Sequence, residues 1–255
     1  MRRPSLRRWR VHQANDSALC GEPGVQRTGP TLLTRSGPAG LDTAIEVRPY
    51  ELRDRSEVRA ICHETGFMGE PADWYWRDRE SFADACTGYY IDQEPESSFV
   101  AARDGRVVGY LLGCIDTTRA PSMAEVSRRL VLRRALLLRP GSAGFFWRAL
   151  FDALRDRGVP SGDLQDARWP SHLHINLLPE ARGAGAGASL MRSWLDRLAM
   201  LGSPGCHLGT FGENRNAIAF FERVGFRHHG PPTLVPGMRN RDSSRMHLQL
   251  MVRES

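Results

Sequence analysis

The chain has 255 residues, of which 41% are hydrophobic and 25% charged, a composition typical of one large folded domain or two small ones. All 35 basic residues are arginine, which excludes Schiff-base chemistry on lysine, and no apolar run is long enough to cross a membrane. The net charge of +6 is concentrated in residues 1–40, where seven arginines face two acids, whereas the remaining 28 arginines face 27 acids; this nearly neutral remainder argues against a nucleic-acid-binding face.

Residues 1–43 are predicted to form a disordered, basic N-terminal tail. Arginine, glycine, proline and serine are frequent there, and the segment shows no hydrophobic period. The arginine pairs at 2–3 and 7–8 are not followed by an apolar segment, which argues against a secretion signal. We interpret the tail as a start-site artefact or an idle extension, with a nucleic-acid-binding arm as the alternative, and place a single domain at 44–255.

The N-terminal part of this domain alternates strands and helices. The pattern predicts a short strand at 44–48, helices at 53–64 and 73–88, and a hairpin of strands 98–103 and 106–116 that turns at Asp104-Gly105. The five cysteines, at positions 20, 62, 86, 114 and 206, contain no Cys-x-x-Cys pair, so neither a zinc site nor a disulfide framework is predicted. Scattered free thiols fit a reducing, cytoplasmic location.

Residues 120–170 are predicted to contribute two amphipathic helices, at 124–138 and 144–157, separated by a turn at 139–142. Their leucines and phenylalanines form a large apolar surface. We expect this surface to pack on the main sheet, and a homodimer interface is the alternative.

A glycine-rich segment at 182–187 lies between a predicted strand at 171–178 and a predicted helix at 186–201. Glycine permits backbone conformations that direct successive N–H groups at one point. The first turn of a helix adds unpaired N–H groups and partial positive charge. The backbone of residues 183–188 is therefore a candidate binding site for a phosphorylated ligand.

Three phosphate-binding templates were compared with this segment. A P-loop requires a lysine, which the chain lacks. A dinucleotide fold requires Gly-x-Gly-x-x-Gly after the first strand, whereas the glycines here alternate and come late in the chain. The template Arg/Gln-x-x-Gly-x-Gly/Ala, the diphosphate loop of acyl-CoA N-acyltransferases, matches Arg182, Gly185 and Gly187. A glycine-rich connection without a ligand is the remaining alternative.

A second segment follows a predicted strand at 206–211 and forms a predicted helix at 214–224. Asn214, Ala217, Phe221 and Gly225-Phe226 resemble the Asn-x-x-Ala-x-x-x-Tyr-x-x-x-Gly-Phe signature of the GNAT superfamily of N-acyltransferases. The order and spacing of the two motifs also suit this family. A proline-rich loop at 230–237 and a last strand at 245–252 complete the chain, and the alternation of strands and helices predicts a layered α/β domain.

The resemblance narrows further to the acetyltransferase-like domain found beside some O-GlcNAc hydrolases and to its free-standing bacterial relatives. It implies a central mixed, mostly antiparallel twisted sheet flanked by helices, with a helical insertion at about 120–160. It also implies acetyl-CoA as cosubstrate, a primary amine of a small molecule or peptide as acceptor, and neither a membrane nor a metal as partner. Acceptor pockets of the family are built by loops that correspond to 66–96 and 230–244.

The resemblance also implies where the cosubstrate binds. Its diphosphate is expected on the amides of the glycine-rich loop, with added charge from Arg182, and its pantetheine arm on the backbone of Leu177, where the family's core strand splays. The full set of expected cofactor-binding residues is Leu177, Arg182, Gly183, Ala184, Gly185, Ala186, Gly187, Ala188, Asn214 and Phe221.

The catalytic groups are less clear because Phe221 occupies the position of the family's frequent general-acid tyrosine. Either the thiolate leaves unassisted, another group protonates it, or the protein is an inactive acyl-CoA-binding module. His174, which alternates with His172 and Asn176 on one face of the core strand, is our candidate base, with a structural histidine as the alternative. Asp116, at the end of the hairpin, is a second candidate, with helix capping as its alternative.

Overall fold

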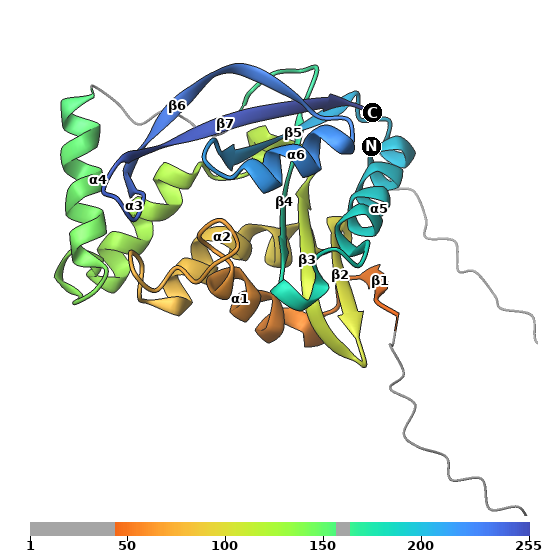
Figure 1. The fold of residues 1–255 in the computed structure, drawn as a ribbon, viewed down its shortest axis with the longest axis horizontal. Coiled ribbons are helices and arrows are strands. Elements are labelled where there is room, and N and C mark those ends of the chain that lie inside the picture. Colours follow the sequence, from red (N-terminus) through yellow and green to blue (C-terminus); the bar gives the residue numbers. More distant parts are fainter. Residues whose placement is uncertain (1–43, 157–163) are drawn as a thin grey trace, which may run out of the picture. The chain divides into compact units, whose positions relative to one another are not determined.

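The structure is a computed structural model that describes residues 44–156 and 164–255 (Figure 1). Its strands are β1 (Glu46–Pro49), β2 (Ser98–Arg103), β3 (Arg106–Cys114), β4 (Ser171–Leu177), β5 (Gly205–Phe211), β6 (Arg227–Arg239) and β7 (Arg245–Glu254). Its α-helices are α1 (Arg55–Glu64), α2 (Arg79–Gln93), α3 (Met123–Arg134), α4 (Ala143–Arg155), α5 (Ala186–Leu201) and α6 (Arg215–Arg223). The predicted tail at 1–43 and the end of the second inserted helix at 157 lie outside the described residues.

The described strands form one sheet in the order β1-β2-β3-β4-β5-β7-β6. β4 and β5 run parallel, and the other neighbouring strands pair antiparallel. The β2–β3 hairpin turns at Asp104 and Gly105, whose φ angles of 52° and 76° are those that a two-residue hairpin turn requires. The predicted mixed, mostly antiparallel sheet flanked by helices is confirmed.

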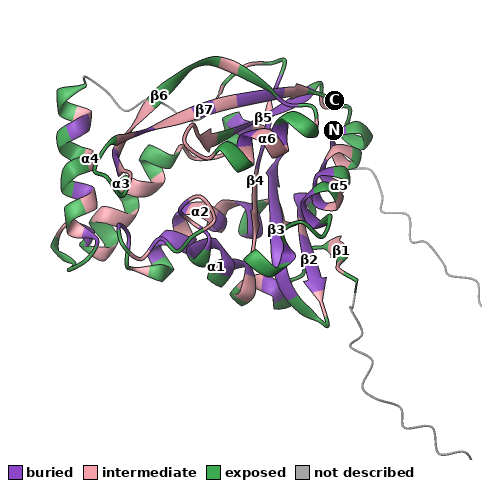
Figure 2. Cartoon of the chain, viewed as in Figure 1, coloured by how far each residue is buried: buried purple, intermediate pink, exposed green. Residues whose placement is uncertain are grey.

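Helices cover both faces of the sheet, and each face has its own apolar cluster (Figure 2). α1 and α2 pack on one face, with Val58, Ile61 and Phe82 among their buried residues. α5 and α6 supply Leu190, Trp194 and Phe221 to the cluster on the other face. Cys62 and Cys114 are buried. The central strands are therefore enclosed on both sides.

The second helix begins six residues later than the pattern predicted. Asp78 caps α2 by accepting a hydrogen bond from the backbone N–H of Ser81 at 3.1 Å. The preceding residues instead form a loop, in which Met68 and Gly69 have φ angles of 51° and 90°. This loop reaches the segment after β4, where Gly69 O accepts a hydrogen bond from Arg182.

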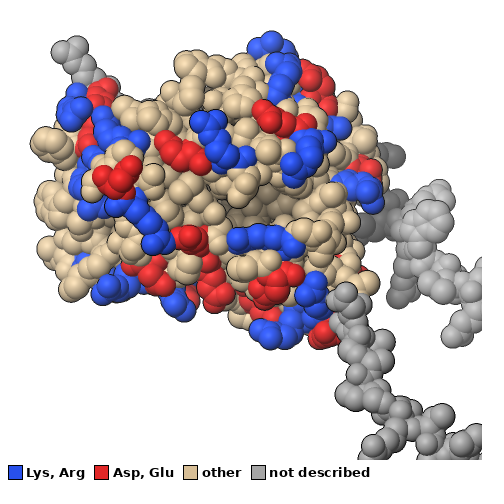
Figure 3. All heavy atoms as spheres, viewed as in Figure 1, with Lys and Arg blue, Asp and Glu red and all other residues tan. Residues whose placement is uncertain are grey.

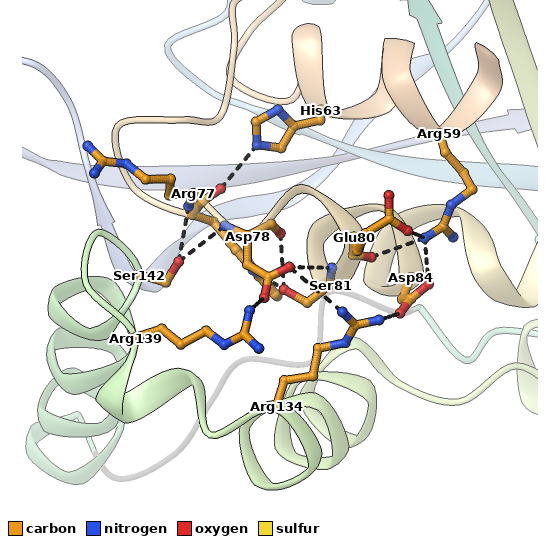
Figure 4. A network of polar contacts seen from close by, with 11 residues as sticks. Arg59, His63, Arg77, Asp78, Glu80, Ser81, Asp84, Arg134, Arg139 and Ser142 are labelled. Atoms are coloured by element: carbon orange, nitrogen blue, oxygen red, sulfur yellow. Dashed lines mark hydrogen bonds and ion pairs between the residues drawn. The ribbon is translucent and has the colours of Figure 1, made fainter. Parts of the chain in front are cut away.

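A polar network fastens the inserted helices to α2 (Figure 4). Asp78 forms an ion pair with Arg139 after α3, and Arg134 of α3 pairs with Asp84 of α2 at 2.8 Å. The buried hydroxyl of Ser142, just before α4, accepts hydrogen bonds from two backbone amides of the loop before α2, the nearer at 3.0 Å. The carboxylate of Asp78 thus caps α2 and also binds the segment that carries the inserted helices.

The apolar surface of α3 and α4 packs on the main domain only in part. Leu136 and Phe146 are buried in the cluster that includes α1 and α2. Leu150, Phe151 and Leu154 are instead exposed, by 45%, 67% and 73%. The expectation that the whole surface faces the sheet was therefore too broad. No helix in the described ranges has the length and apolar character needed to span a membrane.

The predicted proline-rich loop at 230–237 is wrong, because these residues belong to the long strand β6. β6 lies at the edge of the sheet, where a proline needs no hydrogen bond to a further strand. Its pairing with β7 shifts register between His229 and Thr233 and again between Leu234 and Arg239. These irregular stretches accommodate Pro231, Pro232 and Pro236.

Candidate active site

The two parallel strands separate soon after they begin. β4 and β5 pair only at Ser171 with Cys206 and at His172 with His207, although β4 continues for five further residues and β5 for four. On its other side β4 stays paired with β3 as far as Leu177. The edge of β4 that faces β5 is therefore open over 173–177, a splay that includes the expected position at Leu177.

Alternation along β4 decides which backbone groups face this opening. The amide of Leu178 donates to Val108 O of the β3 side at 2.9 Å, so residue 178 is a hydrogen-bonded partner of 108. Leu177, one residue earlier, therefore directs its N–H and C=O away from β3 and toward the splay. An extended amide chain can pair there as an added strand would.

The N-terminus of α5 lies beside the end of β4. Gly187, in the first turn of α5, would bring a Cβ within 3.3 Å of a methyl group of Leu177. Gly183 and Gly185 have φ angles of 77° and 80°, and a Cβ on either would meet no atom within 4 Å. The loop therefore has the left-handed conformations that favour glycine, and open space in front of it.

The amides of this loop are suited to an anion. Gly185 caps α5, and the amide of Ser189 donates the first backbone bond of the helix, to Gly185 O at 3.0 Å. The amides of the cap and of 186–188 precede that bond and have no acceptor within the helix. With the helix dipole they form a cradle that fits a diphosphate.

Arg182 is oriented differently from the sequence expectation. Its Nε and Nη2 donate to Leu177 O at 3.1 and 3.0 Å, and its Nη2 also donates to Gly69 O at 2.7 Å. The guanidinium thereby links the end of β4 to the loop before α2. In this arrangement Arg182 occupies the carbonyl of Leu177, which leaves the N–H of Leu177 for a ligand.

The opposite face of β4 is polar and faces α1 and α2. Tyr90 of α2 contacts the ring of His174 with a centroid distance of 5.2 Å, and its hydroxyl lies 2.8 Å from Nε2 of His172. Asn176 donates to Oγ1 of Thr65 after α1 at 2.5 Å. The splay thus has the glycine cradle on one side of the sheet and these polar groups on the other.

His172 is held in one tautomer by its neighbours. Oγ1 of Thr117 donates its single proton to Pro170 O at 2.7 Å, so it accepts from Nδ1–H of His172, also at 2.7 Å. Nε2 of His172 then accepts from the hydroxyl of Tyr90. Burial lowers the pKa of His172 well below its ordinary value, in keeping with a neutral structural ring.

His174 has no such set of hydrogen-bond partners among the described residues, and it lies nearer the open part of β4. Burial lowers its pKa to about 4, and the neighbouring His207 adds to the effect. The ring is therefore neutral at neutral pH. A neutral imidazole can accept a hydrogen bond, although a group with this pKa is a weak base.

Comparison with known proteins shows the family of this chain. The model of the Acetyltransferase (GNAT) family matches residues 69–226, which is more than half of the chain. The chain belongs to the GNAT acetyltransferase family. The match extends from the loop before α2 to the end of the segment that follows α6, and so includes both sequence motifs.

Solved structures share the fold. The crystal structure of SsHAT is 30% identical, covers 83% of this chain and 98% of its own, and has a TM-score of 0.63. A GCN5-related N-acetyltransferase from Kribbella flavida is 18% identical, with a coverage of 83% and 98% and a TM-score of 0.50. The narrower likeness to domains beside O-GlcNAc hydrolases stays a prediction.

Asp116 of this GNAT domain lies near the closed end of the splay and not at its open end. It follows the end of β3, where Cys114 pairs with His172, whereas the open end of β4 at Leu177 pairs with Gly109. Five residues of strand separate the two ends, a distance of about 17 Å. Its carboxylate caps a 3-10 turn by accepting from the amide of Thr118 at 3.0 Å. This contact fits the capping alternative for Asp116.

The two aromatic residues of α6 have different surroundings. Phe221 is 7% exposed and belongs to the apolar cluster with Ile218 and Phe226. Phe220 instead approaches the cradle, since a Cβ at Gly187 would lie 3.2 Å from its ring. Neither side chain can donate a proton. Asn214 caps α6 by accepting from the amide of Ala217 at 3.2 Å, which accounts for its place in the motif.

Cavities at the open end of the splay contain residues that sequence reasoning did not single out. A smaller cavity of about 370 Å³ lies between the loop after α1, the start of α6 and the β6–β7 turn. Glu213 lines it and accepts from Nδ1 of His247 at 3.0 Å. Figure 3 shows a hollow in the middle of this face, with basic and acidic side chains along its rim. The described residues contain no cluster suited to a metal ion.

Proposed function

We propose that this protein transfers an acetyl group from acetyl-CoA to a primary amine of a small molecule or peptide. The observation that supports this most is the limited pairing of β4 with β5 beside a helix N-terminus capped by Gly185. A diphosphate suits the cradle, and the N–H of Leu177, which faces the splay, suits a pantetheine amide or the acyl oxygen.

The donor supplies a thioester carbonyl, and the chain supplies position and charge stabilisation. The amine nitrogen forms a bond to this carbonyl carbon, the C–S bond breaks, the nitrogen loses one proton, and the sulfur leaves as a thiolate. Proximity of the two reactants contributes several kcal/mol to such a step. A thiol has a pKa of about 8.5, so the thiolate can leave although Phe221 donates no proton.

His174 is our proposed acceptor of a hydrogen bond from the amine. It lies on the face of β4 opposite the cradle, so an amine substrate that enters from the side of α1 and α2 meets the ring of His174. Because its pKa is lowered to about 4, it stays neutral wherever the amine is nucleophilic. We therefore expect it to orient the amine, with water taking the proton.

The first test is calorimetry with acetyl-CoA, CoA and NAD. We expect micromolar binding of acetyl-CoA, loss of that binding in Gly185→Trp, and no binding of NAD. Gly202→Trp is the matched control, because Gly202 ends the same helix with a φ of 67° and also faces open space. Equal loss in both variants would show that strain in α5, rather than a filled cradle, abolishes binding.

A second candidate function is an acyl-CoA-binding module without turnover, favoured by the apolar surroundings of Phe221. Product detection by mass spectrometry with a panel of amines separates the two. We expect product with wild type, a lower kcat with His174→Ala, and unchanged rates with Asp116→Asn. Tight binding of acetyl-CoA without product from any amine would favour the inactive module.

A further inference from the structure

The larger of these two cavities, about 590 Å³, lies between the loop before α2, helix α4 and the end of β6. Its lining residues are Trp74, Arg148, Arg239, Asn240, Arg241 and Ser243. The volume is within the range of small-molecule sites. The lining contains three arginines and no carboxylate, so its charge depends on ion pairs with residues outside the cavity.

Two of the three arginines are neutralised from outside the cavity. Arg239 forms a two-pronged ion pair with the buried carboxylate of Asp152, with distances of 2.7 and 2.9 Å, and Arg241 pairs with Glu70. Arg148 differs, since it forms no ion pair with the described residues, and its Nε donates to Gly237 O at 3.5 Å. Among the residues that the structure describes, Arg148 is therefore the one arginine of this cavity without a carboxylate partner.

Helix α4, which carries the exposed Arg148, and the ring of Trp74 are both held by their surroundings. Asp152 ties α4 to β6, and Phe146 of α4 packs edge-on against Trp76 with a centroid distance of 4.7 Å. Trp74 is 42% exposed, and Phe67 supports its ring with a centroid distance of 4.9 Å. An aromatic surface thus lies in the same cavity as an unpaired guanidinium.

The cavity adjoins the smaller one at the open end of the splay. Asn240 and Arg241 line both cavities. Phe67 lines the smaller cavity and contacts Phe211 at the end of β5, with a centroid distance of 6.2 Å. A ligand seated in the larger cavity therefore extends toward the splay through the smaller one.

We infer that the acceptor is an amino carboxylic acid with a flat apolar portion, an inference that rests on the proposed function. Its carboxylate pairs with Arg148, its apolar portion lies on Trp74, and its amine extends through the smaller cavity toward the splay. A bidentate guanidinium–carboxylate contact provides geometry as well as charge. The amide analogue of such a ligand lacks the charge and keeps the shape.

Calorimetry of the full chain with CoA present tests this with a matched pair of probes, 4-(aminomethyl)benzoate and 4-(aminomethyl)benzamide. We expect the acid to bind about tenfold more tightly than the amide, a ratio that Arg148→Gln removes. Arg133→Gln, on the exposed face of α3, is the control and should keep the ratio. Trp74→Ala should weaken both probes by the same factor, because it removes only the apolar contact.

Equal binding of acid and amide to wild type would overturn the inference, and so would an unchanged ratio in Arg148→Gln. Thermal unfolding of each variant shows whether it is folded. Product formation is scored separately by mass spectrometry. Acetylation of both probes with equal efficiency would overturn the carboxylate preference and leave the acetyltransferase proposal standing. Acid-selective binding with no acetylation of any amine would overturn the acetyltransferase proposal and leave the carboxylate preference standing.

Discussion

Arg182 offers the sharpest test of how the glycine-rich segment works. The family template suggests that it adds charge to the diphosphate site, whereas the structure directs its guanidinium at Leu177 O and Gly69 O. Arg182→Gln removes this link between β4 and the loop before α2. The two interpretations predict different losses for ligands with and without a diphosphate.

The size of the effect follows from the contacts. Hydrogen bonds from a charged donor contribute about 1.5–3 kcal/mol each when they are shielded from water. Arg182 is exposed, and two of its three bonds share one acceptor, so we assign the group about 2 kcal/mol in total. If ligand binding must fix β4 and the loop before α2 in place once this link is lost, the affinity of the ligand falls by about tenfold to thirtyfold.

Titration of acetyl-CoA and of S-acetylpantetheine, followed by ligand-observed NMR, separates the interpretations. A link between β4 and the loop predicts the same factor for both ligands, because both use Leu177. A direct diphosphate contact predicts a loss for acetyl-CoA alone, and that result would refute our reasoning. Arg192→Gln, on the exposed side of α5, should change neither affinity.

Three further predictions concern stability. The pKa of His174 falls from 6.5 to about 4 on folding, so between these pH values the unfolded chain binds a proton at His174 that the folded chain does not. The free energy of unfolding, measured by urea titration, should therefore decline as the pH falls from 6.5 to about 4. The decline should be smaller in His174→Asn. Asp152→Asn breaks a buried ion pair and should lower the free energy of unfolding by about 3–5 kcal/mol, or the melting temperature by on the order of 10 °C. Asp166→Asn, at an exposed ion pair, should change the melting temperature little. Equal shifts in the two variants would contradict this contrast. Gly113→Ala places a Cβ 2.1 Å from Trp194 and should cost about 1–3 kcal/mol; an unchanged melting temperature would show that β3 and α5 pack less closely.

Local chemistry was enough to predict several elements from the sequence. α5 occupies 186–201 as predicted, because glycines with left-handed conformations, Gly185 and Gly202, stand at its two ends. The β2–β3 turn at Asp104 and Gly105 was equally predictable, since few residues adopt its backbone angles. The two motifs indicated the family, and the family model confirmed it.

Elements that depend on distant partners were predicted less well. Prolines normally indicate a loop, and only the place of β6 at the edge of the sheet allows them in a strand. α2 begins late because Asp78 caps it, and the same carboxylate pairs with Arg139, 61 residues further along the chain. No local pattern contains that second contact.

The site shows the same division. The sequence by itself determined the glycine cradle, the polar face of β4 and the missing tyrosine, because each depends on neighbouring residues and on a strand or helix period. Only the tertiary structure placed Asp116 away from the open end of the splay, turned Arg182 toward two carbonyl groups, and joined Trp74, Arg148 and Arg239 in one cavity. Such groupings depend on which strands pair and where the inserted helices dock, and these long-range contacts leave no periodic signal in the sequence.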